Sequence, residues 1–173
     1  MTGPWEPARE LNLTLAYAGV TRFERTGWTD CKAALWVLDT LTRGTQRQRV
    51  EAEAEFVRES NLVALYAPGT IYHEYRTAGE ALNEAYIVFG ATGATERSLR
   101  QLVQPGTHCH IEDPDAAIGS RLARLGELRF HRQPGSEYFA AALLCELVGL
   151  LVTSLPVKAQ LRVVRTGPGP GGE

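Results

Sequence analysis

The sequence predicts a mainly β fold with C-terminal α-helices, a small β-barrel or β-sandwich followed by two to three helices. Up to about residue 92, short β-type runs alternate with turn signals at a spacing typical of barrels and sandwiches. Pro68-Gly69 marks one tight reversal, because proline presets φ and glycine supplies a positive φ. After residue 93 the apolar period becomes that of helices.

The expected strands are apolar or aromatic runs that end at glycine, proline or a polar cluster. They lie within Leu11–Glu24, with Gly19 as a break, and at Ala33–Thr42, Arg47–Arg58, Leu62–Tyr66, Ile71–Arg76 and Glu84–Phe89. The segment Thr26–Lys32 is expected to be a loop because it contains Gly27 and Asp30. For Arg47–Arg58, alternating apolar residues favour a strand, although Glu51–Glu55 alone would favour a helix.

Capping signals predict the helices. Asp113 can serve as an N-cap, Pro114 suits the first helical position, and Asp115 complements the helix dipole. The three expected helices are Glu96–Val103 after Thr95, a helix from Asp113-Pro114-Asp115 to about Leu128, and Glu137–Leu155 between Ser136 and Pro156. The chain thus divides into an N-terminal arm (1–10), a barrel (11–92), a helical region (93–156) and a Gly/Pro-rich linker or tail (157–173).

Composition excludes several classes of function. The formal net charge is −2, so the electrostatics do not favour nucleic-acid binding by this chain itself. Three widely spaced cysteines argue against a disulfide framework and for a reducing, cytoplasmic compartment. No signal peptide is expected at the N-terminus. The apolar stretch Tyr138–Leu155 is marginal in length for a membrane span, and a buried helix is the better interpretation.

That last helix is apolar on two stripes, which indicates burial on two sides. One side can cover the barrel, and a second copy of the chain can cover the other, since leaving it in water forgoes roughly 1.5–3 kcal/mol per side chain. The residues expected at this dimer interface are Leu143, Leu144, Leu147, Val148 and Leu151. The alternative is that the preceding helix, through Ile118, Leu122 and Leu125, covers the second stripe within one monomer.

Taken together, these segments resemble the N-terminal regulatory domain of the AraC (arabinose-operon regulator) family of bacterial transcription regulators. The matching features are Leu35–Gly44, Glu53–Gly69, Ile71–Tyr75, Ala85–Phe89, the Asp113-Pro114 helix start and the leucine-rich closing helix. The resemblance covers about Leu11 to Leu155. One departure is Ser60-Asn61, where the family usually has Gly-Asp.

The resemblance implies a cupin-like, double-stranded β-barrel (jelly roll) that binds a small effector. It also implies two closing helices that form an antiparallel homodimer, an N-terminal arm that can fold over the ligand, and DNA binding through a separate C-terminal helix-turn-helix domain absent from this chain. The effector would be of the sugar or aromatic-acid type. No enzyme activity, catalytic residue or cofactor is expected on this interpretation.

A metal site is not expected, although cupin barrels often hold one. His73 is the one histidine on the predicted barrel strands, and His108-Cys109-His110 follows the first helix. Residues i and i+2 of a strand share a face and could chelate, but a third convergent ligand is not apparent. The serines lie in turns or helices without a nucleophile motif, and no phosphate-binding glycine loop is present.

The expected ligand-binding residues are aromatic or amphipathic side chains of the barrel strands. They are Trp36, Tyr72, His73, Tyr75 and Tyr86. Arg25 and the stacking role of Tyr86 are implied by the resemblance. Plain core packing is an equal alternative for Trp36, and alternation places Tyr72 on the opposite face from His73 and Tyr75.

Two other functions stay open at this stage. The first is a small cupin enzyme, such as a sugar isomerase or epimerase, which predicts a bound metal or a buried acid–base pair such as His73 with Glu84. The second is a ligand-free oligomerisation module. Both differ from the sensor interpretation, which requires the strands to form a hollow cup lined for an organic guest.

Overall fold

The first eight strands pair like one long hairpin rolled onto itself. The computed structural model describes residues 12–22, 26–60, 62–76, 83–130 and 133–153. Strand β1 pairs with β8, β2 with β7, β3 with β6 and β4 with β5, all antiparallel. This nested pairing is that of a jelly roll, and it confirms the predicted fold class. The expected arm (1–10), Arg25 and the expected tail (157–173) lie outside the described residues.

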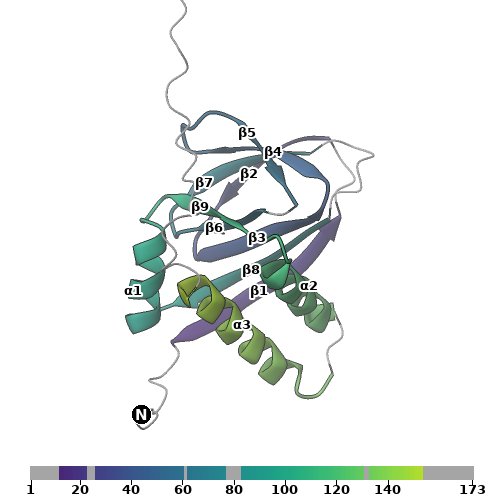
Figure 1. Ribbon diagram of the computed structural model, residues 1–173, viewed down its shortest axis with the longest axis vertical. Helices are drawn as coiled ribbons and strands as arrows, with labels where there is room; N and C mark the ends of the chain where they lie inside the picture. Colours follow the sequence, from purple (N-terminus) through teal and green to yellow (C-terminus); the bar gives the residue numbers. More distant parts are fainter. Residues whose placement is uncertain (1–11, 23–25, 61, 77–82, 131–132, 154–173) are drawn as a thin grey trace, which may run out of the picture.

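The strands form two sheets that face one another across the barrel (Figure 1). A five-stranded sheet has the order β1-β8-β3-β6-β9, and a four-stranded sheet has the order β2-β7-β4-β5. The strand bounds are β1 Leu13–Arg22, β2 Gly27–Lys32, β3 Trp36–Arg43, β4 Thr45–Val50, β5 Phe56–Glu59, β6 Leu62–Tyr66, β7 Ile71–Arg76, β8 Asn83–Ala91 and β9 His108–Glu112. Strand β9, within the range expected to be helical, adds the fifth strand beside β6.

Two sequence predictions about strands were wrong for physical reasons. The predicted loop Thr26–Lys32 is strand β2, which pairs along its whole length with β7. It is an edge strand with its outer side chains in solvent, where glycine and aspartate are tolerated. The predicted single strand Arg47–Arg58 is instead the hairpin β4–β5, whose connection includes Glu51 at a positive φ of 49°.

The expected break at Gly19 is also absent, since β1 continues through it and shifts register between Leu15 and Tyr17 instead. Gly19 serves a packing role: a Cβ there would lie 3.1 Å from the rings of both Tyr17 and Tyr86. The glycine therefore allows the two rings to lie directly over the backbone of β1.

The described residues include three helices, of which α2 and α3 cover the outer face of the five-stranded sheet near β1 and β8 (Figure 1), while α1 contacts α3. They are α1 Gly93–Leu102, α2 Ala117–Phe130 and α3 Ser136–Thr153. Helix α1 begins after Thr92 rather than Thr95. Helix α2 begins four residues after Asp113, yet the Asp113 carboxylate still accepts hydrogen bonds from the backbone N–H groups of Ile118 (3.1 Å) and Gly119 (2.8 Å). Asp113 therefore caps this helix from outside its first turn.

The larger hydrophobic core lies between this sheet and the helices. Its buried members include Trp36, Leu38, Ile87, Phe89 and Leu122. Four of the residues expected at a dimer interface, Leu144, Leu147, Val148 and Leu151, belong to the same core, and Leu143 packs partly buried beside it. Their burial within one chain corresponds to the alternative in which the monomer covers the second stripe itself.

The outward face of α3 remains apolar at its N-terminal end, where Tyr138 and Phe139 are 77% and 67% exposed. By length and composition α3 is also the one described helix that could cross a membrane. Its buried side, however, forms part of the domain core. We therefore describe α3 as the closing helix of the domain, with one face in the core and one face outside.

Two helical glycines provide a matched test of this packing. A Cβ on Gly126 would lie 2.6 Å from a methyl group of Val20 and 3.1 Å from the backbone carbon of Gly19, whereas a Cβ on Gly149 would meet nothing within 4 Å. We expect Gly149→Ala to raise the free energy of unfolding by up to about 1 kcal/mol. The free energy of unfolding of Gly126→Ala should be about 2 kcal/mol lower than that of Gly149→Ala, because α2 must move away from β1. Urea unfolding followed by circular dichroism measures both, and equal stabilities would contradict the close α2–β1 contact.

Candidate functional site

The interior between the two sheets is polar over much of its depth. Strand alternation sends one set of side chains inward from β3, β4, β5, β7 and β8. Six of these inward groups are charged or amide side chains that are less than a tenth exposed: Asp39, Gln46, Gln48, Arg58, Glu74 and Glu84. Buried polar groups at this density indicate a site or a structural network rather than a simple core.

Arg58 on β5 lies at the centre of this cluster, with its side chain 0% exposed. Its Nη1 forms an ion pair with Asp39 of β3 and donates to the hydroxyl of Tyr66 on β6 at 3.3 Å. Its Nη2 lies 4.0 Å from Glu84 of β8. Burial alone would lower the pKa of Arg58, but the charges of Asp39, Tyr66, Glu84 and Glu74 raise it above its ordinary value. Arg58 therefore stays protonated and joins the two sheets electrostatically.

Gln48 on β4 connects this cluster to the opposite wall. Its Nε2 donates to the Tyr66 hydroxyl at 2.5 Å and to Glu74 Oε1 at 3.3 Å. The ring of Tyr66 stacks on that of Tyr72, with centroids 4.1 Å apart and planes 11° apart. Burial is the main reason that the pKa of both tyrosines is raised well above the ordinary value, so both hydroxyls stay protonated.

The inward side chains are more exposed near β1 and β2, each of which is an edge strand of its sheet. There Thr29, Cys31 and Tyr86 are half-buried and Tyr17 is 38% exposed. We call these four residues the mouth. The Tyr17 and Tyr86 rings stack with centroids 5.5 Å apart. Burial, followed by the hydrogen bond with Tyr17, raises the pKa of Tyr86 to about 12.

The aromatic ring of Tyr17 is covered by a cation. The guanidinium carbon of Arg129, on α2, lies 3.9 Å from the Tyr17 ring centroid. The mouth thus offers aromatic faces and hydroxyl groups above the charged interior. This combination suits a small guest with both apolar and polar sides.

A pair of histidines closes another part of the interior. His108 and His110 of β9 lie 4.9 Å apart, and Phe56 of β5 stacks on His108 and meets His110 edge-on. Burial lowers the pKa of His108 and, with His108 and Arg58 adding to the effect, lowers that of His110 to about 3. Both rings are therefore neutral at neutral pH. Cys109 points to the opposite face, into the helix-side core, where burial raises the pKa of its thiol to about 12.

The structure places the sequence-predicted ligand residues in four different environments. Tyr72 points into the interior and Tyr86 lies at the mouth. Trp36 is 1% exposed and packs in the core beneath the helices, so it faces away from the interior. His73 and Tyr75 lie on the outer face of the four-stranded sheet. Arg25 lies outside the described residues.

On the outer face of the four-stranded sheet, His73 and Tyr75 each contact a side chain of the neighbouring strand β2. His73 Nδ1 lies 2.7 Å from Asp30 Oδ1. Tyr75 meets Trp28 edge-on at 5.3 Å, and the guanidinium of Arg47 lies 4.7 Å from the Tyr75 ring. These contacts are local surface pairs on the side of the sheet away from the interior.

Sequence reasoning missed Asp39, Arg58 and Glu74, and it named Glu84 only as a possible acid–base partner of His73. Asp39 sits inside an apolar run, where a charge on a predicted strand is a signal that could have been used. Glu74 was passed over between His73 and Tyr75, although alternation places it on the same face as Tyr72. Arg58 carries no such signal, because arginines occur both on the exposed face of β4 (Arg47 and Arg49) and on the inward face of β5.

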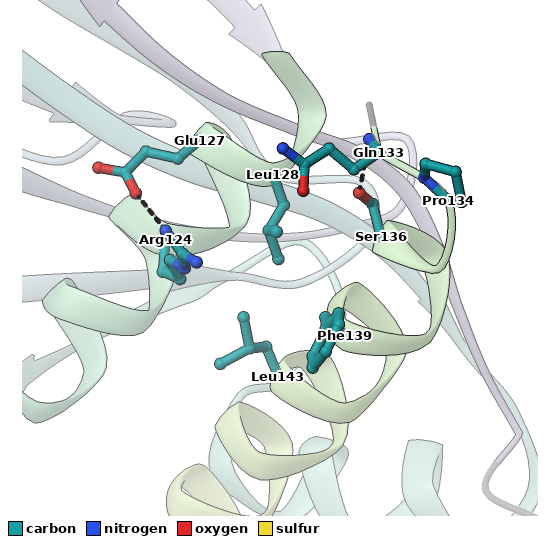
Figure 2. A pocket seen from close by; sticks show the side chains of 8 residues that line it. All are labelled: Arg124, Glu127, Leu128, Gln133, Pro134, Ser136, Phe139 and Leu143. Carbon is teal, nitrogen blue, oxygen red and sulfur yellow. Dashed lines mark hydrogen bonds and ion pairs between the residues drawn. The ribbon is translucent and has the colours of Figure 1, made fainter. Parts of the chain in front are cut away.

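Two surface cavities lie outside the barrel, beside α2 and the N-terminal part of α3. One has a volume of about 470 Å³ and opens between the two helices (Figure 2). Its lining consists of Arg124, Glu127 and Leu128 from α2, Gln133 and Pro134 from the connection, and Ser136, Phe139 and Leu143 from α3. The other, about 280 Å³, lies toward β1 and shares Leu128, Gln133 and Ser136 with the first.

Comparison with known proteins gives no matching family model and no match among curated proteins. The fold itself is similar to crystal structures of ToxT from Vibrio cholerae. The apo K231A form superposes with a TM-score of 0.52 at 10% identity over 88% of this chain and 59% of that one. The unsaturated fatty acid-bound wild-type form gives 0.52 at 10% over 86% and 57%, and ToxT of strain O395 gives 0.51 at 8% over 84% and 55%. The chain therefore spans little more than half the length of these structures.

The buried ion pair yields a direct test of the interior. Arg58→Ala removes the buried cation that pairs with Asp39 and lies 4.0 Å from Glu84, so we expect a loss of about 3–5 kcal/mol in the free energy of unfolding. The matched control is Arg47→Ala, which breaks the exposed pair with Glu55 and should cost far less. Urea denaturation measures both variants. A comparable small loss in the two would show that Arg58 does not organise the interior.

Proposed function

We propose that this chain is the small-molecule effector-binding and dimerisation domain of an AraC-type bacterial transcription regulator. DNA would be bound by a separate helix-turn-helix domain. Effector binding at the mouth of the barrel would change the population of dimer geometries and so bias the attached DNA-binding domain. The observation that carries the proposal is the stacked and partly exposed Tyr17–Tyr86 pair of the jelly roll, together with a closing helix that has an exposed apolar face.

The likeness in fold supports this assignment. ToxT, an AraC-family regulator, matches 84–88% of this chain, while the chain matches only 55–59% of ToxT. The remainder of ToxT leaves room for a further domain of the kind proposed. One of these structures holds an unsaturated fatty acid, which shows that the fold of ToxT accommodates a small organic ligand.

The effector is proposed to bind at the mouth of the barrel and not inside the hollow cup that was expected from the sequence. The deep interior is filled by the protein's own side chains, chiefly Arg58, Tyr66 and Tyr72. The mouth, by contrast, keeps Tyr17 and Tyr86 half open to solvent. An effector of sugar or aromatic type could place one face on this tyrosine pair and its polar groups toward Thr29.

The enzyme alternative loses the acid–base pair on which it depended. His73 is on the outer face of the sheet with Asp30, whereas Glu84 is buried inside with Arg58. The neutral, buried His108 and His110 offer two nitrogen ligands on one strand, and a catalytic zinc site needs a third protein ligand. A regulatory, cytoplasmic binding domain is therefore the function we favour.

The dimer interface proposed here is the outward face of α3 rather than its buried leucines. That face contains Tyr138, Phe139, Ala142 and Gly149, all exposed. A second copy of α3, packed antiparallel, would cover the two aromatic rings, and the small residues would allow a close approach of the helices.

Effector binding can be located with two matched tyrosine variants. A thermal-shift screen of sugars, aromatic acids and fatty acids should find a compound that adds about 2.7 kcal/mol of stability at a hundredfold excess over its dissociation constant. We expect Tyr86→Ala to abolish that shift and Tyr75→Ala, on the outer face, to retain it. If Tyr86→Ala keeps the full shift and Leu143→Arg loses it, the effector binds in the α2–α3 cavity instead. If no compound shifts the melting temperature, the oligomerisation module becomes the better interpretation.

The dimer can be tested at a position where the monomer has free space. Gly149→Arg adds a long charged side chain at a site with nothing within 4 Å, so the fold should be retained while a helix–helix contact is blocked. We expect sedimentation velocity to show a dimer for the unmodified chain and a monomer for Gly149→Arg. The control is Val57→Arg, at a 58% exposed position on β5, which should stay dimeric. An unmodified chain that stays monomeric at high concentration would refute the dimer.

A further inference from the structure

Helix α2 has three arginines, and Arg129 in its last turn is the one without an acidic partner among the described residues. Arg121 pairs with Glu146 at 2.5 Å, and Arg124 pairs with Glu127 at 3.0 Å. Arg129 is exposed, and it makes neither an ion pair nor a hydrogen bond within the described part of the chain. No described carboxylate therefore neutralises this guanidinium directly.

Two stacked tyrosine rings hold the guanidinium beside the mouth of the barrel. The guanidinium carbon of Arg129 lies 3.9 Å from the centroid of the Tyr17 ring, and that ring stacks on Tyr86 with planes 21° apart. Cation–π attraction uses the charge of an arginine but none of its five N–H donors. The stack therefore restricts where the Arg129 side chain lies and leaves its hydrogen-bond donors available to a guest.

The groups around this stack include two acids, and neither of them pairs with the guanidinium. Glu84 influences Tyr86 electrostatically, but it is only 6% exposed and belongs to the interior. Glu137 of α3 is exposed and lines the same surface cavity as Arg129 without forming an ion pair with it. Tyr17 and Tyr86 add hydroxyl groups that are hydrogen-bonded to each other. The stack itself therefore presents one cation and two hydroxyl groups.

The chemistry of the stack selects the class of guest. The planar fork of a guanidinium matches the two oxygen atoms of a carboxylate, and the tyrosine rings match an apolar or aromatic body. A phosphate dianion would need more positive charge than one arginine supplies. A neutral sugar would use the rings and hydroxyl groups but leave the charge of Arg129 without a partner. A small organic monocarboxylate uses all of these groups together.

We propose that the effector is a small organic carboxylate whose anionic group binds the guanidinium of Arg129 beside Tyr17 and Tyr86. The tyrosine hydroxyl groups would donate further hydrogen bonds to it, and its apolar part would lie against the two rings. This inference rests on the proposed function and names the class of effector that the mouth binds. The residue that sets the preference for acids over neutral compounds would then come from α2 and not from the barrel strands.

Matched acids and amides test the requirement for charge. Benzoate, phenylacetate and hexanoate, with benzamide, phenylacetamide and hexanamide as neutral counterparts, would be titrated into the full ¹⁵N-labelled chain up to about 10 mM, where a millimolar ligand is close to saturation. We expect at least one acid to bind about tenfold more tightly than its amide and to shift the Nε–H signal of Arg129.

Variants of two arginines on the same helix locate the contact. Arg129→Gln should weaken binding of that acid about tenfold, and Arg129→Lys should weaken it less, because lysine keeps the charge but loses the planar fork. The matched control is Arg124→Gln, which removes an exposed arginine that pairs with Glu127 and should leave the affinity unchanged. Circular dichroism establishes that each variant folds.

Equal affinities for acids and amides would refute the inference, as would unchanged acid binding by Arg129→Gln. If amides or sugars bind and Tyr86→Ala abolishes that binding, the proposed effector site stands and only the carboxylate is wrong. If none of the acids, amides or sugars binds, the proposed function fails together with this inference. Should Arg129→Gln not fold, the comparison of acids with amides on the unmodified chain decides, with the Nε–H signal of Arg129 reporting the contact.

Discussion

The ion pair between Arg58 and Asp39 is the interaction on which the rest of the interior depends. A guanidinium that is fully buried requires acceptors on several sides, and here they come from β3, β6 and β8 of the facing sheet. The same strands then cannot slide by one residue, because a slip would turn Asp39 or Glu84 toward the helix-side core. The register of the roll and the polarity of its interior are thus two consequences of one contact.

This arrangement divides the molecule into layers with different chemistry. The helix side of the five-stranded sheet is apolar and holds Trp36 and the leucines of α3. The interior is charged and filled by side chains at depth, and Tyr17 and Tyr86 are among its less buried inward side chains in the described part of the chain. A binding domain with this structure would recognise its guest at the mouth, while the charged interior below fixes the positions of the strands that carry the recognising side chains.

How much of the candidate site could be predicted depended on alternation. Ile71–Arg76 was predicted with the correct bounds, and the separation of Tyr72 from His73 and Tyr75 followed from the period of two along a strand. Which of the two faces points inward did not follow, because both carry aromatic residues. For Trp36 the same ambiguity arose, because β3 is covered on both faces. The structure places Trp36 on the helix side. Arg58 and Gln48 were missed because a polar strand with a polar interior shows no hydrophobic contrast.

The sequence by itself determined the class of the fold, most strand positions and the three helices, because turn residues, caps and apolar periods act over a few neighbouring residues. The tertiary structure decided which strands pair, that Thr26–Lys32 is a strand, and that four leucine-class residues of α3 are covered by their own chain. It also decided where Asp39, Arg58, Glu74 and Glu84 meet. These outcomes depend on contacts between residues far apart in the chain, and no local pattern records a partner that comes from another strand.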